Sequence, residues 1–149
     1  MNRKLLIFMM TVLLASASQL TGDCQVKVSL SGNPNSSHLG TWRLASYKYS
    51  ASGDFVKVPE SNQHIKLITE THFMWAETDL ATGKVSCMAG GTYTLKGNTY
   101  TESIDFGIEM NNYLRRNQNF TLLAEGDLLF LSGVLSDGYH VEEVWQRVK

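Results

Sequence analysis

Cysteine is scarce in this sequence, which argues against two kinds of site. The chain has 149 residues but only two cysteines, Cys24 and Cys87. Neither has a cysteine partner at CxxC spacing, so redox chemistry and a cysteine-based zinc site are not expected. An even pair of cysteines in an exported protein can form a disulfide. The sequence leaves open whether Cys24 and Cys87 are joined or remain two unpaired thiols.

An apolar run long enough to cross a membrane is not found at the N-terminus. The run "LLIFMMTVLL" at Leu5–Leu14 has ten residues, whereas a membrane-spanning helix needs about 20. Basic residues precede it and Ala15-Ser16-Ala17 follows it, which is typical of a cleavable export signal. We expect residues 1–17 to be a cleaved signal peptide and the mature protein to be periplasmic or secreted. A retained membrane anchor is the alternative, and Asp23 before Cys24 fits a lipidation site poorly.

An excess of basic charge is also lacking. The chain carries 13 lysines and arginines against 14 aspartates and glutamates, and loss of residues 1–17 leaves 11 against 14. A nucleic-acid partner would favour a basic face, and binding to a membrane surface would favour a polybasic segment. We therefore expect neither partner.

Motifs of metal centres and of common enzymes are missing. The four histidines form no His-x-x-x-His or Glu-x-x-His cluster, and His72 and His140 each begin an expected strand. We expect no bound metal and no cofactor. A nucleophile elbow and a phosphate-binding loop are absent, so we expect a protein that is not an enzyme. An isomerase or hydrolase that uses Glu102 and a histidine as acid and base is the least favoured alternative.

The residues that are present predict an all-β fold. Alternation of apolar and polar residues with period two recurs in stretches rich in Thr, Tyr, Val, Phe and Trp. Glycine-containing turns such as "TGK" at 82–84 and "KGN" at 96–98 separate these stretches. The expected strands are Thr41–Tyr49, Ile65–Thr69, His72–Glu77, Val85–Leu95, Thr99–Asp105, Asn119–Ala124, Leu128–Leu135 and Tyr139–Val148, with a shorter one near Phe55–Val58.

Short hairpin links between these strands predict an up-and-down antiparallel barrel of about eight strands. Closing the sheet removes its exposed edges, and eight strands leave room for packed side chains or one small ligand. A two-sheet sandwich is the alternative. Residues 18–38 are expected to form an N-terminal arm or linker, because Gln25–His38 is rich in Ser, Asn and Gly. Residues 39–149 are expected to form the barrel domain.

The first strand predicts how one end of the barrel is closed. Gly40 permits a tight bend into the strand, and Trp42 just after it can plug the closed end. Closure sets the first strand beside the last, where Arg147 could stack on the Trp42 ring. Strict alternation places Trp42, Leu44, Ser46 and Lys48 on one face and Arg43, Ala45, Tyr47 and Tyr49 on the other. A filled barrel would make Arg43, Tyr47 and Tyr49 candidates for a protein-binding outer surface.

The same alternation gives candidate ligand-binding residues in the interior. Two of them, Glu102 and Glu143, are carboxylates, which are costly to bury unless paired or hydrogen-bonded. If they point inward, they could anchor a ligand or pair with Lys48 or Arg147. If the register slips by one residue, they are solvated surface groups. The full set is Phe73, Trp75, Tyr93, Tyr100, Glu102, Phe120, Glu143 and Trp145.

One connection is too long for a hairpin turn. Phe106–Gln118, "FGIEMNNYLRRNQ", mixes apolar residues with two arginines. A solvated loop is one interpretation. A lid over the barrel mouth is the other, because long loops in compact domains are often functional.

Four stretches in order resemble a known group of proteins. "LGTWRL", "THFMW", "GGTYTLKGNTYTESI" and "EEVWQR" are similar to those of small secreted bacterial lipocalin-like proteins of the calycin superfamily. The resemblance covers Leu39 to Lys149 and implies a barrel that binds a small hydrophobic or amphipathic molecule. The chain is shorter than the longer lipocalins and lacks their late pair of cysteines. A structural or protein-interaction module with a filled barrel is the alternative function.

Overall fold

A computed structural model gives the fold, and it describes residues 38–149. The expected signal peptide, nearly all of the expected arm and Cys24 lie outside these residues. The described part consists of strands and turns without a helix, so no helix in it could span a membrane. The nine strands are β1 (Gly40–Lys48), β2 (Val56–Lys57), β3 (Asn62–Ile68), β4 (His72–Asp79), β5 (Lys84–Lys96), β6 (Thr99–Ile108), β7 (Asn117–Glu125), β8 (Leu128–Val134) and β9 (His140–Arg147).

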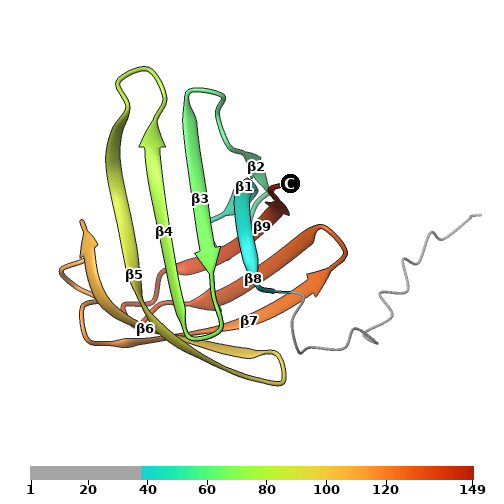
Figure 1. Cartoon of the computed structure of the whole chain (residues 1–149), viewed down its shortest axis with the longest axis vertical. Coiled ribbons are helices and arrows are strands. Elements are labelled where there is room, and N and C mark those ends of the chain that lie inside the picture. The colour runs from blue at the N-terminus through green and yellow to red at the C-terminus, as the bar shows by residue number, and fades with distance from the viewer. Residues whose placement is uncertain (1–37) are drawn as a thin grey trace, which may run out of the picture.

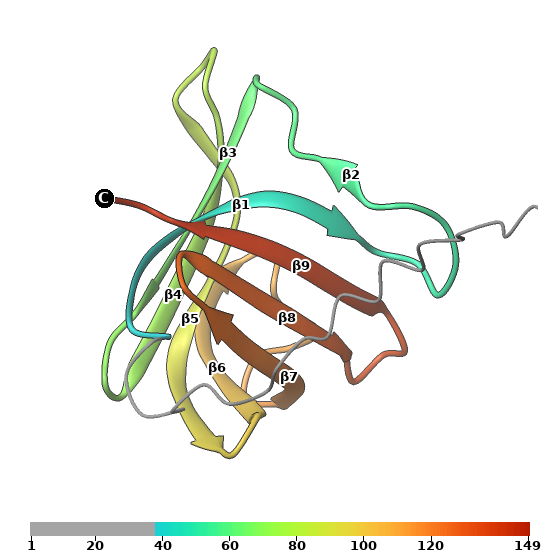
Figure 2. The same ribbon diagram turned by 90° about the vertical axis from the view of Figure 1, so that its right-hand side faces the viewer.

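The strands form a closed antiparallel barrel, as the alternation predicts. Neighbours along the chain pair in meander order from β3 to β9, and β1 pairs with both β3 and β9 to close the wall. The short β2 pairs only with β1 and lies outside the closed ring. Figure 1 shows β3, β4 and β5 on one side of the barrel, with β7, β8 and β9 running in a different direction across the other. Figure 2 shows β1 lying along β9, with β2 beyond it.

Trp42 plugs one end of this barrel and is fully buried. Its indole Nε1 donates to the His38 carbonyl oxygen at 2.9 Å. The Arg147 guanidinium carbon lies 4.1 Å from the Trp42 ring centroid, and Arg147 Nη1 donates to the Leu39 carbonyl at 2.8 Å. Gly40 has φ +129°, and a Cβ there would come within 2.8 Å of Arg147 Nη1. The Gly40 position is therefore left without a side chain so that Arg147 can reach the plug.

A β-bulge between Leu44 and Ser46 changes which residues of β1 face inward. The inserted residue reverses the alternation, so Tyr47 and Tyr49 pack against the core. Lys48 points outward, where its Nζ lies 2.7 Å from Glu142 Oε1. The expected inward position of Lys48 and the expected outward positions of Tyr47 and Tyr49 are wrong for this reason, whereas Arg43, before the bulge, is exposed as expected.

The connection between β6 and β7 is shorter than the sequence suggests. Strand β6 continues to Ile108, because beyond a register shift at Gly90–Gly91 it stays paired with β5 as far as Met88. Pairing of β6 with β7 ends at Ser103–Asn117, so the two strands separate beyond that point. The connecting loop therefore spans residues 109–116, and the Arg115 backbone N–H donates to the Ile104 carbonyl at 2.8 Å.

Candidate functional site

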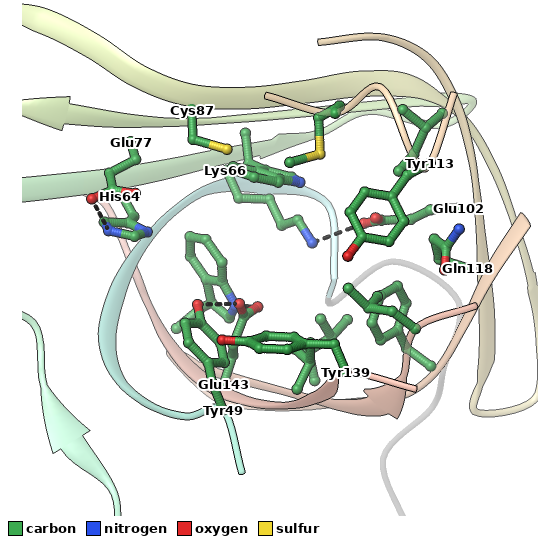
Figure 3. A pocket seen from close by; sticks show the side chains of 18 residues that line it. Tyr49, His64, Lys66, Glu77, Cys87, Glu102, Tyr113, Gln118, Tyr139 and Glu143 are labelled. Atoms are coloured by element: carbon green, nitrogen blue, oxygen red, sulfur yellow. Dashed lines mark hydrogen bonds and ion pairs between the residues drawn. The ribbon is translucent and has the colours of Figure 1, made fainter. Parts of the chain in front are cut away.

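The barrel holds a cavity of about 280 Å³ at the end away from Trp42. Its apolar wall consists of Trp75, Ile104, Met110, Phe120, Leu131, Leu135, Val141 and Trp145. Its polar groups come from Tyr49, His64, Lys66, Glu77, Cys87, Glu102, Tyr113, Gln118, Tyr139 and Glu143. Figure 3 shows three separate contacts among these polar groups: Lys66 with Glu102, Tyr49 with Glu143, and His64 with Glu77.

Five of the eight residues expected in the interior line this cavity: Trp75, Glu102, Phe120, Glu143 and Trp145. The other three, Phe73, Tyr93 and Tyr100, are not on its wall. Phe73 and Tyr100 are buried in the packed core beneath it. Tyr93 lies nearer the closed end, where its hydroxyl donates to the Thr69 carbonyl at 2.7 Å and lies 3.0 Å from His38 Nε2.

A buried ion pair crosses the cavity floor. Lys66 Nζ on β3 donates to Glu102 Oε1 on β6 at 2.8 Å, and the two side chains are 2% and 4% exposed. Burial raises the pKa of Glu102, while the Lys66 charge and hydrogen bond act in the opposite direction. The rings of Phe73, Tyr100 and Trp145 lie 5.9, 5.7 and 5.4 Å from Lys66 Nζ. The lysine is thus held by one carboxylate and three aromatic faces.

A second carboxylate, Glu143 on β9, is held by two neutral donors. Its Oε1 accepts from the Tyr49 hydroxyl at 2.8 Å, and its Oε2 accepts from Trp145 Nε1 at 2.9 Å. Burial and the nearby Glu143 charge raise the pKa of Tyr49 well above its ordinary value. Tyr49 therefore remains a neutral donor to Glu143 throughout the ordinary pH range. Of the two alternatives for Glu102 and Glu143, pairing with Lys48 or Arg147 is wrong, because Lys48 faces outward and Arg147 lies over Trp42.

The third carboxylate, Glu77 on β4, lies at the rim. Its Oε1 accepts from Asn62 Nδ2 at 3.0 Å and lies 3.5 Å from His64 Nε2. Cys87 is paired with Glu77 across the β4–β5 ladder. Burial and the Glu77 charge raise the pKa of the Cys87 thiol, which keeps it protonated and poorly nucleophilic.

The loop of residues 109–116 covers one side of the cavity through Met110 and Tyr113. The Tyr113 hydroxyl donates to Asp137 Oδ2 at 2.6 Å, which ties the loop to the β8–β9 turn. Burial together with this Asp137 contact raises the pKa of Tyr113 to about 12. Gln118 adds a link to the same turn, because its Oε1 accepts from the Ser136 backbone N–H at 2.9 Å. This is the arrangement expected of the lid interpretation rather than of a free solvated loop.

Among the lining residues that sequence reasoning missed, Lys66 and Tyr49 hold the two inner carboxylates. The burial of Lys66 could not be predicted, because on β3 the lysine is buried while its apolar neighbour Leu67 is 38% exposed. Alternation normally places the apolar residue inside and the charged one outside. The usable signal was Ile68, which shares the inward face of β3 with Lys66. The inward position of Tyr49 could not be predicted either, because no local sequence feature indicates the bulge in β1.

Three or more potential metal-ligating side chains do not gather anywhere among residues 38–149. The histidines expected at strand starts, His72 and His140, are absent from the cavity wall. The cavity therefore offers hydrogen bonds, one buried ion pair and aromatic faces to whatever enters it.

Replacing Tyr100 by phenylalanine should protect the protein at alkaline pH. The Tyr100 hydroxyl is buried without a well-formed hydrogen bond among the described residues, and burial and the Glu102 charge raise its pKa far above the ordinary value of about 10. Above pH 10 the unfolded chain loses this proton and the folded chain keeps it. The free energy of unfolding should therefore fall by about 1.4 kcal/mol per pH unit for this group. Urea unfolding of wild type and Tyr100→Phe from pH 8 to 11.5 should show curves that diverge above pH 10; parallel curves would contradict this.

Comparison with solved structures supports the fold. The chain is similar to a lipocalin-like protein from Bacteroides uniformis ATCC 8492, with 18% sequence identity and a TM-score of 0.55. The similarity covers 76% of this chain and 100% of that chain. At this identity the likeness extends to the lipocalin-like barrel. Comparison with curated proteins gives no match.

A family model also matches, over residues 37–149, which include the whole barrel. Its description is "Domain of unknown function (DUF4488)". The chain therefore belongs to this family, and its barrel is lipocalin-like.

Proposed function

We propose that this protein is a non-enzymatic binding protein that holds one small hydrophobic or amphipathic molecule inside its barrel. The observation that carries the proposal is the cavity of about 280 Å³ with a mainly apolar and aromatic wall. Ligand sites in proteins combine such walls with a few placed polar groups. The lipocalin-like fold adds support, because it is a binding-protein type of fold.

The cavity volume points to a compact ligand. An engineered cavity of roughly 150 Å³ holds one benzene molecule. A volume of about 280 Å³ therefore suits a molecule with about a dozen non-hydrogen atoms. A long acyl chain would not fit without movement of the loop of residues 109–116.

The state of the acidic groups supports binding over catalysis. The Glu102 carboxylate is held by Lys66 at 2.8 Å rather than facing a histidine. His64 lies instead beside Glu77. An acid–base pair of Glu102 and a histidine, the arrangement that would favour an isomerase or hydrolase, does not form around the described cavity.

Export to the periplasm or beyond is part of the same proposal. It is supported by the basic head, the apolar run Leu5–Leu14 and the small residues before Ser18. Peptide mapping of protein from a host that exports it should give a chain starting at Ser18. A chain that still begins at Met1 would contradict export by cleavage.

Titration calorimetry with a matched pair of variants tests the carrier function. 2-Phenylethanol and 2-phenylethylamine each fit the cavity volume, and at least one should bind saturably with one molecule per chain. Leu135→Trp should abolish this, because Leu135 lines the cavity and a tryptophan there would fill it. Val134→Trp is the control, since Val134 is exposed on the outer face next to it. No saturable binding of either compound, or equal binding to both variants, would overturn the proposal in favour of a filled barrel that acts through its outer surface.

A further inference from the structure

We propose that the ligand is a small organic cation, an apolar or aromatic amine whose nitrogen is bound by Glu143. This inference rests on the proposed carrier function and narrows its ligand class. It comes from the charges that face the cavity. Three carboxylates line it, those of Glu77, Glu102 and Glu143, against one lysine, Lys66.

The single lysine is already neutralised. Lys66 Nζ lies 2.8 Å from Glu102 Oε1, and both side chains are almost completely buried. A ligand anion would therefore meet a neutral ion pair, the Glu143 carboxylate, and Glu77, whose Oε1 lies 3.5 Å from His64 Nε2. Charges of like sign repel strongly where water is excluded. The cavity thus disfavours a carboxylate ligand such as a fatty acid.

Glu143, unlike Glu102, has no basic partner among the described residues. Within residues 38–149 no basic side chain lies within ion-pair distance of its carboxylate. Its two hydrogen bonds come from neutral groups, the Tyr49 hydroxyl and Trp145 Nε1. An ionised carboxylate can accept about four hydrogen bonds, so about two positions remain for a ligand. A charged ammonium donor would supply both the hydrogen bond and the missing positive charge.

The aromatic groups around Glu143 suit a cation as well. Tyr49 and Tyr139 lie together, with ring centroids 5.7 Å apart, and Trp145 is hydrogen-bonded to the same carboxylate. Figure 3 shows Tyr49, Tyr139 and Glu143 gathered on one side of the cavity, facing Lys66 and Glu102 on the other. Aromatic faces attract a cation that lies within about 6 Å of the ring centroid, and more strongly where water is excluded. The protein already uses this interaction once, since three rings surround Lys66 Nζ.

Three probes of similar size and different charge test the inference. They are 2-phenylethylamine (a cation), 2-phenylethanol (neutral) and 3-phenylpropionate (an anion), each titrated calorimetrically into the full chain at neutral pH. The amine should bind about tenfold or more tighter than the alcohol, because a charge-assisted hydrogen bond is added. The anion should bind more weakly than the alcohol.

Glu143→Gln should reduce the affinity for the amine by about tenfold or more and change that for the alcohol by less than about twofold. The glutamine keeps an oxygen to accept from Tyr49 or Trp145 while removing the charge. Glu142→Gln is the matched control, because Glu142 is next to Glu143 in the chain but pairs with the outward-facing Lys48. That variant should bind all three probes as the wild type does.

The outcomes separate this inference from the carrier function. Equal or tighter binding of the alcohol or the anion would overturn the inference and leave the carrier function standing. A Glu143→Gln variant that loses amine and alcohol alike would also overturn it, because Glu143 would then only hold Tyr49 and Trp145 in place. Failure of all three probes to bind would overturn the carrier function itself, and the inference with it.

Discussion

Lys66→Met is expected to lower the free energy of unfolding by about 3–5 kcal/mol, the range for breaking one side of a buried ion pair. Lys66 and Glu102 are both nearly inaccessible to water, and their 2.8 Å contact joins β3 to β6 across the barrel. Without the lysine, Glu102 would be left as a buried carboxyl that must either stay charged without a partner or take up a proton. Methionine fills nearly the same space, so the loss should be electrostatic rather than a packing defect.

The double variant Lys66→Met/Glu102→Leu should recover most of that loss. Replacing both members of a buried pair by apolar residues of similar volume is often neutral or stabilising. Urea unfolding of the wild type, Lys66→Met, Glu102→Leu and the double variant gives the coupling energy between the two sites. If Lys66→Met does not fold, recovery of folding in the double variant supports the same conclusion. Additive losses would contradict it and would show that each side chain stabilises the barrel independently.

Trp42→Ala is expected to cost about 3–5 kcal/mol, the usual range for deleting a fully packed tryptophan. Trp42 is completely buried, with Arg147 stacked on its ring and the His38 carbonyl accepting from its indole Nε1. Arg147 is itself held in place by its hydrogen bond to the Leu39 carbonyl. Alanine would open a large cavity at the closed end and leave Arg147 without its aromatic face. Thermal and urea unfolding measure the loss.

Trp42→Phe is the matched variant for the plug. It keeps a ring beneath Arg147 but removes the indole Nε1 that donates to His38. Its loss should be clearly smaller than that of Trp42→Ala. A Trp42→Ala protein within about 1 kcal/mol of the wild type, as for a surface substitution, would contradict the role of Trp42 as the plug.

The barrel could be predicted from the sequence because its determinants are local. Period-two alternation and glycine turns mark each strand and hairpin, and the structure places strands at all the expected stretches. The closure of the barrel could be predicted for a similar reason. Gly40 and Trp42 lie in the first strand and Arg147 lies in the last, and a closed barrel must bring these two strands together.

The composition of the cavity could be predicted only in part, because much of it depends on contacts between distant strands. Glu102 and Glu143 could be placed inward by simple alternation from Tyr100 and Trp145. Tyr49 could not, since the bulge that turns it inward is defined by how β1 pairs with β9. Lys66 is buried only because Glu102, 36 residues later, faces it across the barrel.

The most direct test of a ligand-binding cavity uses the three tryptophans of the chain as reporters. Trp75 and Trp145 line the cavity, whereas Trp42 lies in the plug at the other end. We would record the indole N–H signals in a ¹⁵N–¹H NMR spectrum of the labelled full chain while adding 2-phenylethylamine or 2-phenylethanol. We expect saturable shifts for Trp75 and Trp145, with Trp42 unchanged. Unchanged signals for Trp75 and Trp145 with both compounds, or equal shifts at all three tryptophans, would contradict it.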